Sequence, residues 1–364
     1  MSMSFPLVPD VATTPAEEIA RILTDPGFGI HFTDHMALAI WTEAEGWHDD
    51  RIEGYHPLAL GPAGAVLHYG QEIFEGLKAY RRQDGSVWLF RPDMNAARLN
   101  RSADRMTLPR LPEADFLAAI GGLVALDQAW VPEADEMSLY IRPFMFGSDQ
   151  FLGVRSAAEV TFAAIASPCG PYFADGISPV KIWISTDLSR AGQGGTGAAK
   201  CGGNYAASLL ATRQAQQQGC SQVLFTDAAD HEWLEELGGM NVFLVTSDGR
   251  LLTPPTSGTI LDGITRDSVM TLAPEFGLTV QERPISLSEL LSGIGSRNVV
   301  EAFACGTAAV ITPIGTFRLE REGKIEDFSL PEPFGPKTAD LRRRLVDIQW
   351  GRTTDQFGWT TRVA

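Results

Sequence analysis

The sequence is poor in basic residues, with 29 lysines and arginines against 45 aspartates and glutamates and a formal net charge of −16 at pH 7. A surface with this excess of negative charge repels a phosphate backbone, which argues against nucleic acid as a partner. Small anions can still bind where backbone amides converge. The charge therefore favours a soluble protein with small-molecule ligands.

Cysteine is also scarce, at four residues in 364. The four form no C-x-x-C pair and share no spacing with histidines that is typical of a zinc site. They are Cys169, Cys201, Cys220 and Cys305. We therefore expect no metal and a reduced, cytoplasmic setting.

Long apolar runs are absent, and no stretch approaches the roughly 20 apolar residues that cross a bilayer. The first residues lack the basic start and apolar core of a signal peptide, because Asp10 and three prolines interrupt them. We expect no membrane partner, and we interpret residues 1–12 as a flexible N-terminal arm.

The length and a hydrophobic content of 44% predict two domains, each with its own core. In the first half, β-rich runs are mixed with segments of helical periodicity. The predicted strands are 87–90, 139–141 and 160–166, and the predicted helices are 94–106 and 114–129. We expect a smaller N-terminal α/β domain at 13–170, followed by a linker at 171–179 that is rich in proline and glycine.

The second half is typical of a larger C-terminal α/β domain at 180–364. Its predicted elements are buried strands at 180–185, 223–226, 242–245 and 299–303, with helices near 205–218 and 265–272. The expected fold class is therefore α/β (α+β) with two domains.

One lysine has an unusual setting. Lys200 is the only charged residue between Arg190 and Arg213, and its neighbours are small or neutral. An amine that attacks an aldehyde must be unprotonated, and burial lowers a lysine pKa. Small neighbours also leave room for a flat cofactor. Taken alone, an ordinary surface lysine in a flexible glycine loop is the better explanation of this segment.

The run from Gly192 to Gly197 spells G-x-G-x-x-G, the pattern of a dinucleotide-binding turn. Its context is poor, because the preceding strand ends several residues earlier and the next helix begins only near Asn204. No acidic residue follows about 20 positions later, so we do not assign a nucleotide to it.

Two glycine-containing turns and one helix are candidate anion sites. The run 261–267 places Gly263 and Thr265 at a helix start, where free amides bind phosphate, although capping by Asp262 or Thr265 is the simpler explanation. The turn 305–309 follows a strand and presents backbone amides, unless it is a plain tight turn. On the helix from Met94, one of Arg98, Arg101 and Arg105 could face a buried anion, or all three could be solvated.

Two adjacent acids, Glu235 and Glu236, precede a glycine turn and the strand at 242–245. A partly buried carboxylate there could pair with a protonated pyridine nitrogen. Surface charge is the alternative for either residue.

Taken in order, these segments resemble the branched-chain aminotransferases, which are fold type IV pyridoxal-phosphate enzymes. The resemblance runs from about residue 30 to the C-terminus. The motifs that carry it are His68-Tyr69-Gly70, Phe74-Glu75-Gly76, Phe90-Arg91-Pro92, Tyr140-Ile141-Arg142-Pro143, Lys200-Cys201-Gly202-Gly203-Asn204-Tyr205, Glu236-Leu237-Gly238-Gly239-Met240-Asn241, Gly263-Ile264-Thr265-Arg266-Asp267 and Gly306-Thr307-Ala308.

The resemblance implies that pyridoxal 5′-phosphate binds between the two domains and that Lys200 holds it as a Schiff base. It further implies that Glu236 pairs with the pyridine nitrogen and that Tyr205 bonds the phenolate oxygen. The implied phosphate ligands are Arg98, Gly263, Ile264, Thr265 and Thr307.

For the substrate, the resemblance implies a carboxylate site and an apolar pocket. Arg142 would receive the second carboxylate of glutamate or 2-oxoglutarate. The other implied substrate residues are Tyr69, Phe74, Tyr140, Tyr172, Thr307 and Ala308. The mammalian members carry a C-x-x-C after the Gly-Thr-Ala turn, whereas Ala309 and Thr312 stand here. We therefore expect no thiol switch at this turn, and Cys201 to be a packing residue.

The implied activity moves the amino group of L-leucine, L-isoleucine or L-valine to 2-oxoglutarate by a ping-pong mechanism in a homodimer. A D-amino-acid aminotransferase or an aminodeoxychorismate lyase would share the lysine and the glutamate. A nucleotide-binding or non-catalytic interaction protein is the alternative from another class.

Overall fold

The computed structural model describes residues 2–9, 11–171 and 176–364. The chain divides into two compact units. The first comprises Met1–Ala174, Ala199–Gly202 and Ile348–Ala364, and the second comprises Asp175–Ala198 and Gly203–Asp347.

The first unit contains an antiparallel sheet, which in the described residues has eight strands in the order β17-β5-β4-β6-β7-β1-β2, with β3 paired to β6. The strands are β1 (His35–Thr42), β2 (Gly46–Gly54), β3 (Glu72–Phe74), β4 (Leu77–Arg81), β5 (Val87–Phe90), β6 (Ser138–Gly147), β7 (Glu159–Cys169) and β17 (Thr360–Arg362). The last strand comes from the end of the chain and pairs with β5.

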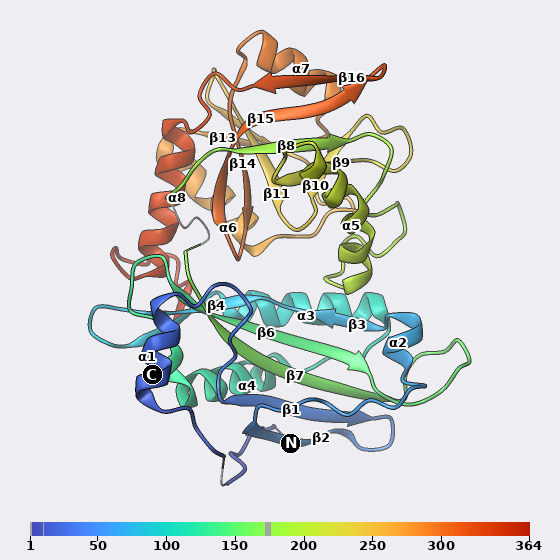
Figure 1. Ribbon diagram of the computed structural model, residues 1–364, viewed down its shortest axis with the longest axis vertical. Helices are drawn as coiled ribbons and strands as arrows, with labels where there is room; N and C mark the ends of the chain where they lie inside the picture. The colour runs from blue at the N-terminus through green and yellow to red at the C-terminus, as the bar shows by residue number, and fades with distance from the viewer. Residues whose placement is uncertain (1, 10, 172–175) are drawn as a thin grey trace. The chain divides into compact units, whose positions relative to one another are not determined.

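Two long helices of the first unit run alongside this sheet (Figure 1). The helices of this unit are α1 (Ala16–Thr24), α2 (Ala65–Tyr69), α3 (Pro92–Met106), α4 (Glu113–Leu126) and the 3-10 turn η1 (Gln128–Trp130). In α3 the apolar stripe Ala96, Leu99 and Ala103 is buried at a helical spacing and joins the core of the sheet. The same core includes Ala199 and Cys201.

The N-terminal residues differ from the expected flexible arm. Met3 and Phe5 are buried in the core of the first unit, and Leu7 forms a β-bridge with Ile52. The Met3 amide donates to Asp115, at 2.9 Å. The prolines prevent a helix here, but an extended segment still buries its apolar side chains and finds carboxylate acceptors for its amides.

The second unit contains a mixed sheet. In its described residues nine strands follow the order β10-β9-β8-β15-β14-β11-β12-β13, with β16 paired to β15. They are β8 (Val180–Ser185), β9 (Gln222–Thr226), β10 (Leu234–Leu237), β11 (Asn241–Thr246), β12 (Arg250–Thr253), β13 (Thr279–Glu282), β14 (Val299–Gly306), β15 (Val310–Arg321) and β16 (Lys324–Ser329). The pairs β8–β9, β8–β15 and β12–β13 are parallel.

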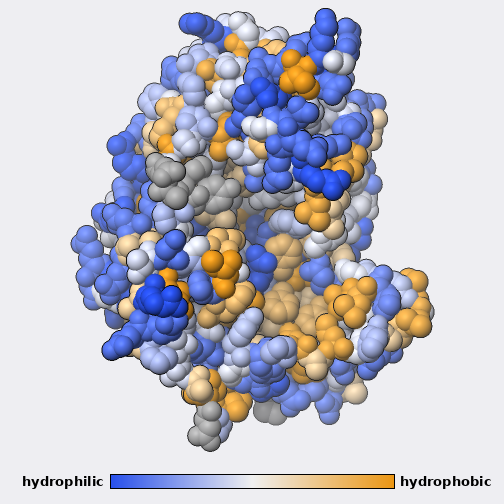
Figure 2. Space-filling model, viewed as in Figure 1, coloured by the Kyte–Doolittle hydropathy of each residue, from blue (hydrophilic) through white to orange (hydrophobic). Residues whose placement is uncertain are grey.

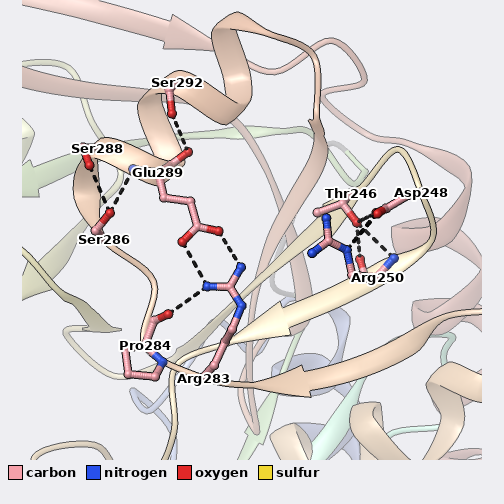
Figure 3. Close-up of polar contacts among 9 residues, drawn as sticks. All are labelled: Thr246, Asp248, Arg250, Arg283, Pro284, Ser286, Ser288, Glu289 and Ser292. Carbon is pink, nitrogen blue, oxygen red and sulfur yellow. Dashed lines mark hydrogen bonds and ion pairs between the residues drawn. The ribbon is translucent and has the colours of Figure 1, made fainter.

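The helices after the junction are α5 (Gly202–Gln217), α6 (Ile264–Leu272), the 3-10 turn η2 (Ala273–Phe276), α7 (Leu287–Gly295) and α8 (Pro336–Gln349). Figure 3 shows how α7 begins: the Ser286 side chain accepts the amide of Glu289 at 3.0 Å. The Glu289 carboxylate pairs with Arg283. In the same view, Thr246, Asp248 and Arg250 bond one another across the turn from β11 to β12.

Every strand and helix predicted from the sequence corresponds to an element of the same type, with bounds that differ by a few residues. The division of the chain differs more. The expected domain at 180–364 included Lys200 and the C-terminus, whereas Ala199–Gly202 and Ile348–Ala364 group with the first unit. The reason is long-range bonding: the Lys200 amide donates to Ser102, and β17 extends the first sheet.

Of the described residues, none lies in a helix with the length and apolar content needed to cross a membrane. Within the same ranges, no three or more His, Cys, Asp or Glu side chains are arranged to hold a metal ion. All four cysteines are buried and free. Exposed apolar side chains gather over α2 and the loop between β6 and β7, where Leu67, Leu152 and Val154 reach solvent (Figure 2).

Candidate active site

The backbone of Lys200 is fixed on both sides by the first unit. Its amide donates to the Ser102 hydroxyl of α3 at 2.9 Å, and its carbonyl accepts the Phe74 amide at 2.9 Å. Two residues later, the Gly202 amide donates to the Glu72 carboxylate. These bonds hold residues 199–202 between α3 and β3, so the lysine side chain starts from a defined position.

The Lys200 side chain is half-buried, and its Nζ lies 4.7 Å from the centroid of the Phe74 ring. Burial, followed by the positive charge of Arg98, lowers the pKa of Lys200 from 10.5 to about 8. The negative charge of Glu75 acts in the opposite direction. An amine with this pKa is partly unprotonated near neutral pH and can act as a nucleophile or a base.

Arg98 is buried, whereas Arg101 and Arg105 on the same helix are exposed. Its Nε and Nη2 each donate to one oxygen of Glu75 at 2.8 Å. Glu75 also accepts the Asn95 side chain at 2.7 Å. Although burial opposes it, the charges of Arg98 and Lys200 hold the pKa of Glu75 below its ordinary value. The pair therefore places a fixed guanidinium and carboxylate beside the lysine.

Three further predicted residues stand beside Lys200. The Arg142 guanidinium lies 4.7 Å from the Phe74 ring centroid, and its Nη2 donates to the Tyr140 hydroxyl at 3.1 Å. The Arg142 Nε is buried and has no hydrogen-bond partner among the described residues. A Cβ at Gly76 would overlap the Tyr140 hydroxyl oxygen, so a glycine is needed there for Tyr140 to keep its place. This group offers a cation with an unused donor next to an aromatic wall.

Tyr69 is not joined to this group. Its hydroxyl donates to the Leu152 carbonyl and its ring stacks on Phe151, at 6.0 Å between centroids. Among the described residues, its polar and ring contacts do not include Lys200. Tyr172, predicted as a pocket wall, lies outside the described residues.

In the second unit, Glu236 is buried on β10 and is bonded on both oxygens. Its Oε1 lies 2.6 Å from Arg190 Nη2 and accepts the Leu261 amide at 2.8 Å. Its Oε2 accepts Asn241 Nδ2 at 3.2 Å. A buried carboxylate held by a guanidinium is stabilised as the anion, which is the form that can accept a bond from a protonated pyridine nitrogen.

The other predicted residues of this unit lie in segments that pack closely around the turn between β10 and β11. At three glycines of these segments, a Cβ would come close to a neighbouring side chain. A Cβ at Gly263 would overlap Asn241 Oδ1, so the start of α6 touches this turn. A Cβ at Gly239 would lie 3.5 Å from the Tyr205 ring, and a Cβ at Gly306, next to Thr307, would lie 3.1 Å from the Met240 side chain. The sequence stretches that contain Tyr205, Glu236, Thr265 and Thr307 therefore converge within the second unit.

The start of α6 has the form of an anion site. Gly263 is its N-cap, with φ −75° and ψ 128°, and it contributes no side chain to cap the helix. The first two residues, Ile264 and Thr265, are buried. Asp262, the residue before Gly263, is not the N-cap of this helix. Thr307 and Ala308 are half-buried in the turn that follows β14.

The sequence alone left three partners unidentified. Glu75 stands inside the Phe-Glu-Gly motif, and Asn241 ends the motif that begins at Glu236, so position in these motifs was an available signal. In the sequence, Arg190 was noted only as the first charged residue before Lys200. No local pattern indicates that it has a role in the site. Gly197, at the end of the glycine run, is required by packing, because a Cβ there would overlap the Thr259 carbonyl oxygen.

Comparisons with known proteins agree with this arrangement. The family model of amino-transferase class IV matches residues 72–317. A branched-chain-amino-acid aminotransferase of Mycolicibacterium smegmatis is 49% identical over 358 residues, covering 96% of both chains.

Solved structures are also similar. The branched-chain amino acid aminotransferase of Escherichia coli has a TM-score of 0.73 at 29% identity, covering 90% of this chain and 100% of that chain. The corresponding enzyme of Thermobaculum terrenum, solved in its PLP-form, has a TM-score of 0.70 at 25% identity, covering 90% and 98%. The matched family model and the near full-length identity lead to one conclusion: this chain belongs to the amino-transferase class IV family.

Proposed function

We propose that this protein is a branched-chain aminotransferase that moves the amino group of L-leucine, L-isoleucine or L-valine to 2-oxoglutarate, using pyridoxal 5′-phosphate. The observation that carries the proposal is Lys200, a half-buried lysine whose pKa is lowered to about 8 beside Arg98 and Glu75. The near full-length similarity to an enzyme of this name supports the substrate class.

The residues present fit this cofactor. An aldehyde needs an unprotonated amine, and Lys200 provides one. A pyridinium needs an anionic acceptor, and Glu236 is a buried carboxylate paired with Arg190. A phosphate needs several donors, for which the sequence offers Arg98, the Gly263-Ile264-Thr265 helix start and Thr307. Tyr205 would donate to the phenolate oxygen.

When bound, the cofactor supplies an electron-withdrawing ring that lets the α-proton of an amino acid leave. Lys200 Nζ would receive this proton and return it to a different carbon, because its lowered pKa permits transfer in both directions. Glu236 would keep the ring nitrogen protonated. The amino donor and acceptor would bind in turn at the same residues, which gives ping-pong kinetics.

The substrate residues follow from the same proposal. Arg142, with its unpartnered Nε, would receive the second carboxylate of glutamate or 2-oxoglutarate. Phe74 would form an apolar wall, and Tyr140 and the amides of Thr307 and Ala308 would bind the other carboxylate of the substrate. We also propose a homodimer, which the family resemblance implies, and a cytoplasmic location, which the four free cysteines favour.

The test is a donor panel on purified wild-type protein and Lys200→Ala. Wild-type protein should absorb visible light, convert L-leucine, L-isoleucine and L-valine, and leave D-leucine unchanged. Lys200→Ala should lose both the attached chromophore and at least about 1,000-fold of the rate, about 4 kcal/mol of barrier. A colourless wild type, conversion of D-leucine alone, or an active Lys200→Ala would contradict the proposal.

A further inference from the structure

The second unit holds a cavity of about 500 Å³ that the proposed chemistry does not use. We call it the Glu235 cavity, after one of its lining residues. Its wall is mainly apolar and includes Trp233, Ile260 and Pro284, and none of its lining residues is basic. The volume lies within the range of about 300–1,000 Å³ that is usual for small-molecule sites.

One residue of the cavity wall, Glu235, carries an acceptor without a donor in the described part of the chain. Glu235 is 5% exposed, and its Oε2 is buried with no hydrogen-bond partner among the described residues. A buried acceptor without a donor costs free energy, so such a group in a cavity wall indicates a ligand that brings the donor. Burial raises the pKa of Glu235, opposed by a hydrogen bond from Thr259 and by the charge of Arg190.

The second carboxylate of the cavity, Asp227, is fully occupied. Each of its oxygens accepts two backbone amides, from residues 229, 230, 232 and 233. Although burial opposes them, these bonds hold the pKa of Asp227 below its ordinary value. Asp227 therefore adds negative charge to the cavity, while Glu235 has the vacant acceptor. A ligand carboxylate would be repelled, which excludes the amino acids and 2-oxo acids of the transamination itself.

We propose that the Glu235 cavity binds a small apolar ammonium ion. The cationic group pairs with Glu235 under the negative potential of Asp227, and the indole of Trp233 offers a face for a cation. The apolar remainder of the ligand lies against Ile260 and Pro284.

The cavity wall is also connected to Glu236. Arg190 Nη2 donates to the Thr259 carbonyl at 2.8 Å and lies 2.6 Å from Glu236. The Leu261 amide, two residues after Thr259, donates to the same carboxylate oxygen. A ligand that moves Thr259 or Ile260 therefore alters the bonding of Glu236. This regulatory consequence rests on the proposed function, whereas the binding site does not.

The test uses protonated N,N-dimethylbenzylamine, a tertiary ammonium that carries one N–H donor and cannot form a Schiff base, titrated into the holoenzyme by calorimetry. One equivalent per chain should bind, and benzyl alcohol, which has no charge, should bind at least about tenfold more weakly. Glu235→Gln should lose about tenfold or more in affinity, and Trp233→Ala should also bind more weakly. Glu326→Gln, an exposed acid on β16, serves as the matched control and should bind like the wild type.

Further measurements separate the possible failures. The titration is repeated with the enzyme saturated by 4-methylvaleric acid, and the stoichiometry should persist; displacement would show that the cation occupies the amino-acid pocket and would overturn the proposal. Absence of saturable binding, or equal affinity in Glu235→Gln, would also overturn it. Binding without any change in the visible absorbance of the cofactor would overturn the link to Glu236 alone. A protein that binds the cation but never takes up pyridoxal phosphate would refute the proposed function and leave the site standing.

Discussion

The lowered pKa of Lys200 predicts how fast the protein captures its cofactor. With a pKa of about 8 instead of 10.5, about a tenth of the amine is unprotonated at pH 7, against about 0.03% for an ordinary lysine. The gain in reactive amine is about 300-fold. Because only the unprotonated amine attacks the aldehyde, the capture rate should rise about tenfold per pH unit and level off above pH 8.

Glu75→Gln perturbs this pKa in a known direction. The charge of Glu75 raises the pKa of Lys200, so its removal should move the pKa below about 8. The capture rate at pH 7 should therefore increase, but by no more than about tenfold, because about a tenth of the amine is already unprotonated. The same change removes the partner of buried Arg98, which should lower the free energy of unfolding by about 3–5 kcal/mol.

The assay mixes cofactor-free protein with pyridoxal phosphate between pH 6 and 10 and follows the visible absorbance. Ionisation of the cofactor itself is common to all variants and cancels in the comparison. Glu326→Gln should reproduce the wild-type profile, and Lys200→Ala should show no capture phase. An inflection near pH 10 in the wild type, or a Glu75→Gln inflection that is unchanged or higher, would refute the reasoning.

Three further substitutions test the second unit. Arg190→Met leaves Glu236 buried without its cation, so the free energy of unfolding in urea should fall by about 3–5 kcal/mol, and an unchanged value would show that the pair contributes nothing. Gly197→Ala places a Cβ against the Thr259 carbonyl and should cost about 1–3 kcal/mol in the same assay, with weaker cofactor retention on dialysis; wild-type behaviour would mean that this contact relaxes freely. Ser286→Ala removes the N-cap of α7 and should cost about 1 kcal/mol with no loss of activity, so a loss of transamination would contradict a purely local role.

Periodicity and turn residues were sufficient to predict some of the regular elements, whereas others, such as β1, β2, α7 and α8, were not predicted. The strand at 180–185 and the apolar stripe of α3 are local patterns, and local patterns are readable in a sequence. The N-terminal residues were different, because the acceptors for their amides, Asp50 and Asp115, are distant in sequence. Contacts of that kind leave no periodic signal.

The candidate site likewise contains residues that local motifs reveal and residues that only long-range contacts define. The segments around Lys200, Glu236 and Gly263 stood out as motifs because each concentrates special residues within a few positions. Arg190 could not be identified, since its role depends on contacts with Glu236 and the Thr259 carbonyl, which are both distant in sequence. Local pattern did not separate Glu235 from Glu236, and only the family resemblance selected Glu236. In the structure both are buried, and the partners of their oxygens distinguish them.

The position of β17 has a consequence for synthesis of the protein. This strand, Thr360–Arg362, forms the edge of the first sheet by pairing with β5, Val87–Phe90, which is made much earlier. On the ribosome, the residues of the second unit up to Asp347 emerge before that edge exists. The first unit is thus finished only after the second has emerged. Lys200, which is fixed by its bonds to Ser102 and Phe74, depends on a unit whose sheet is completed after the residues of the second unit have been made.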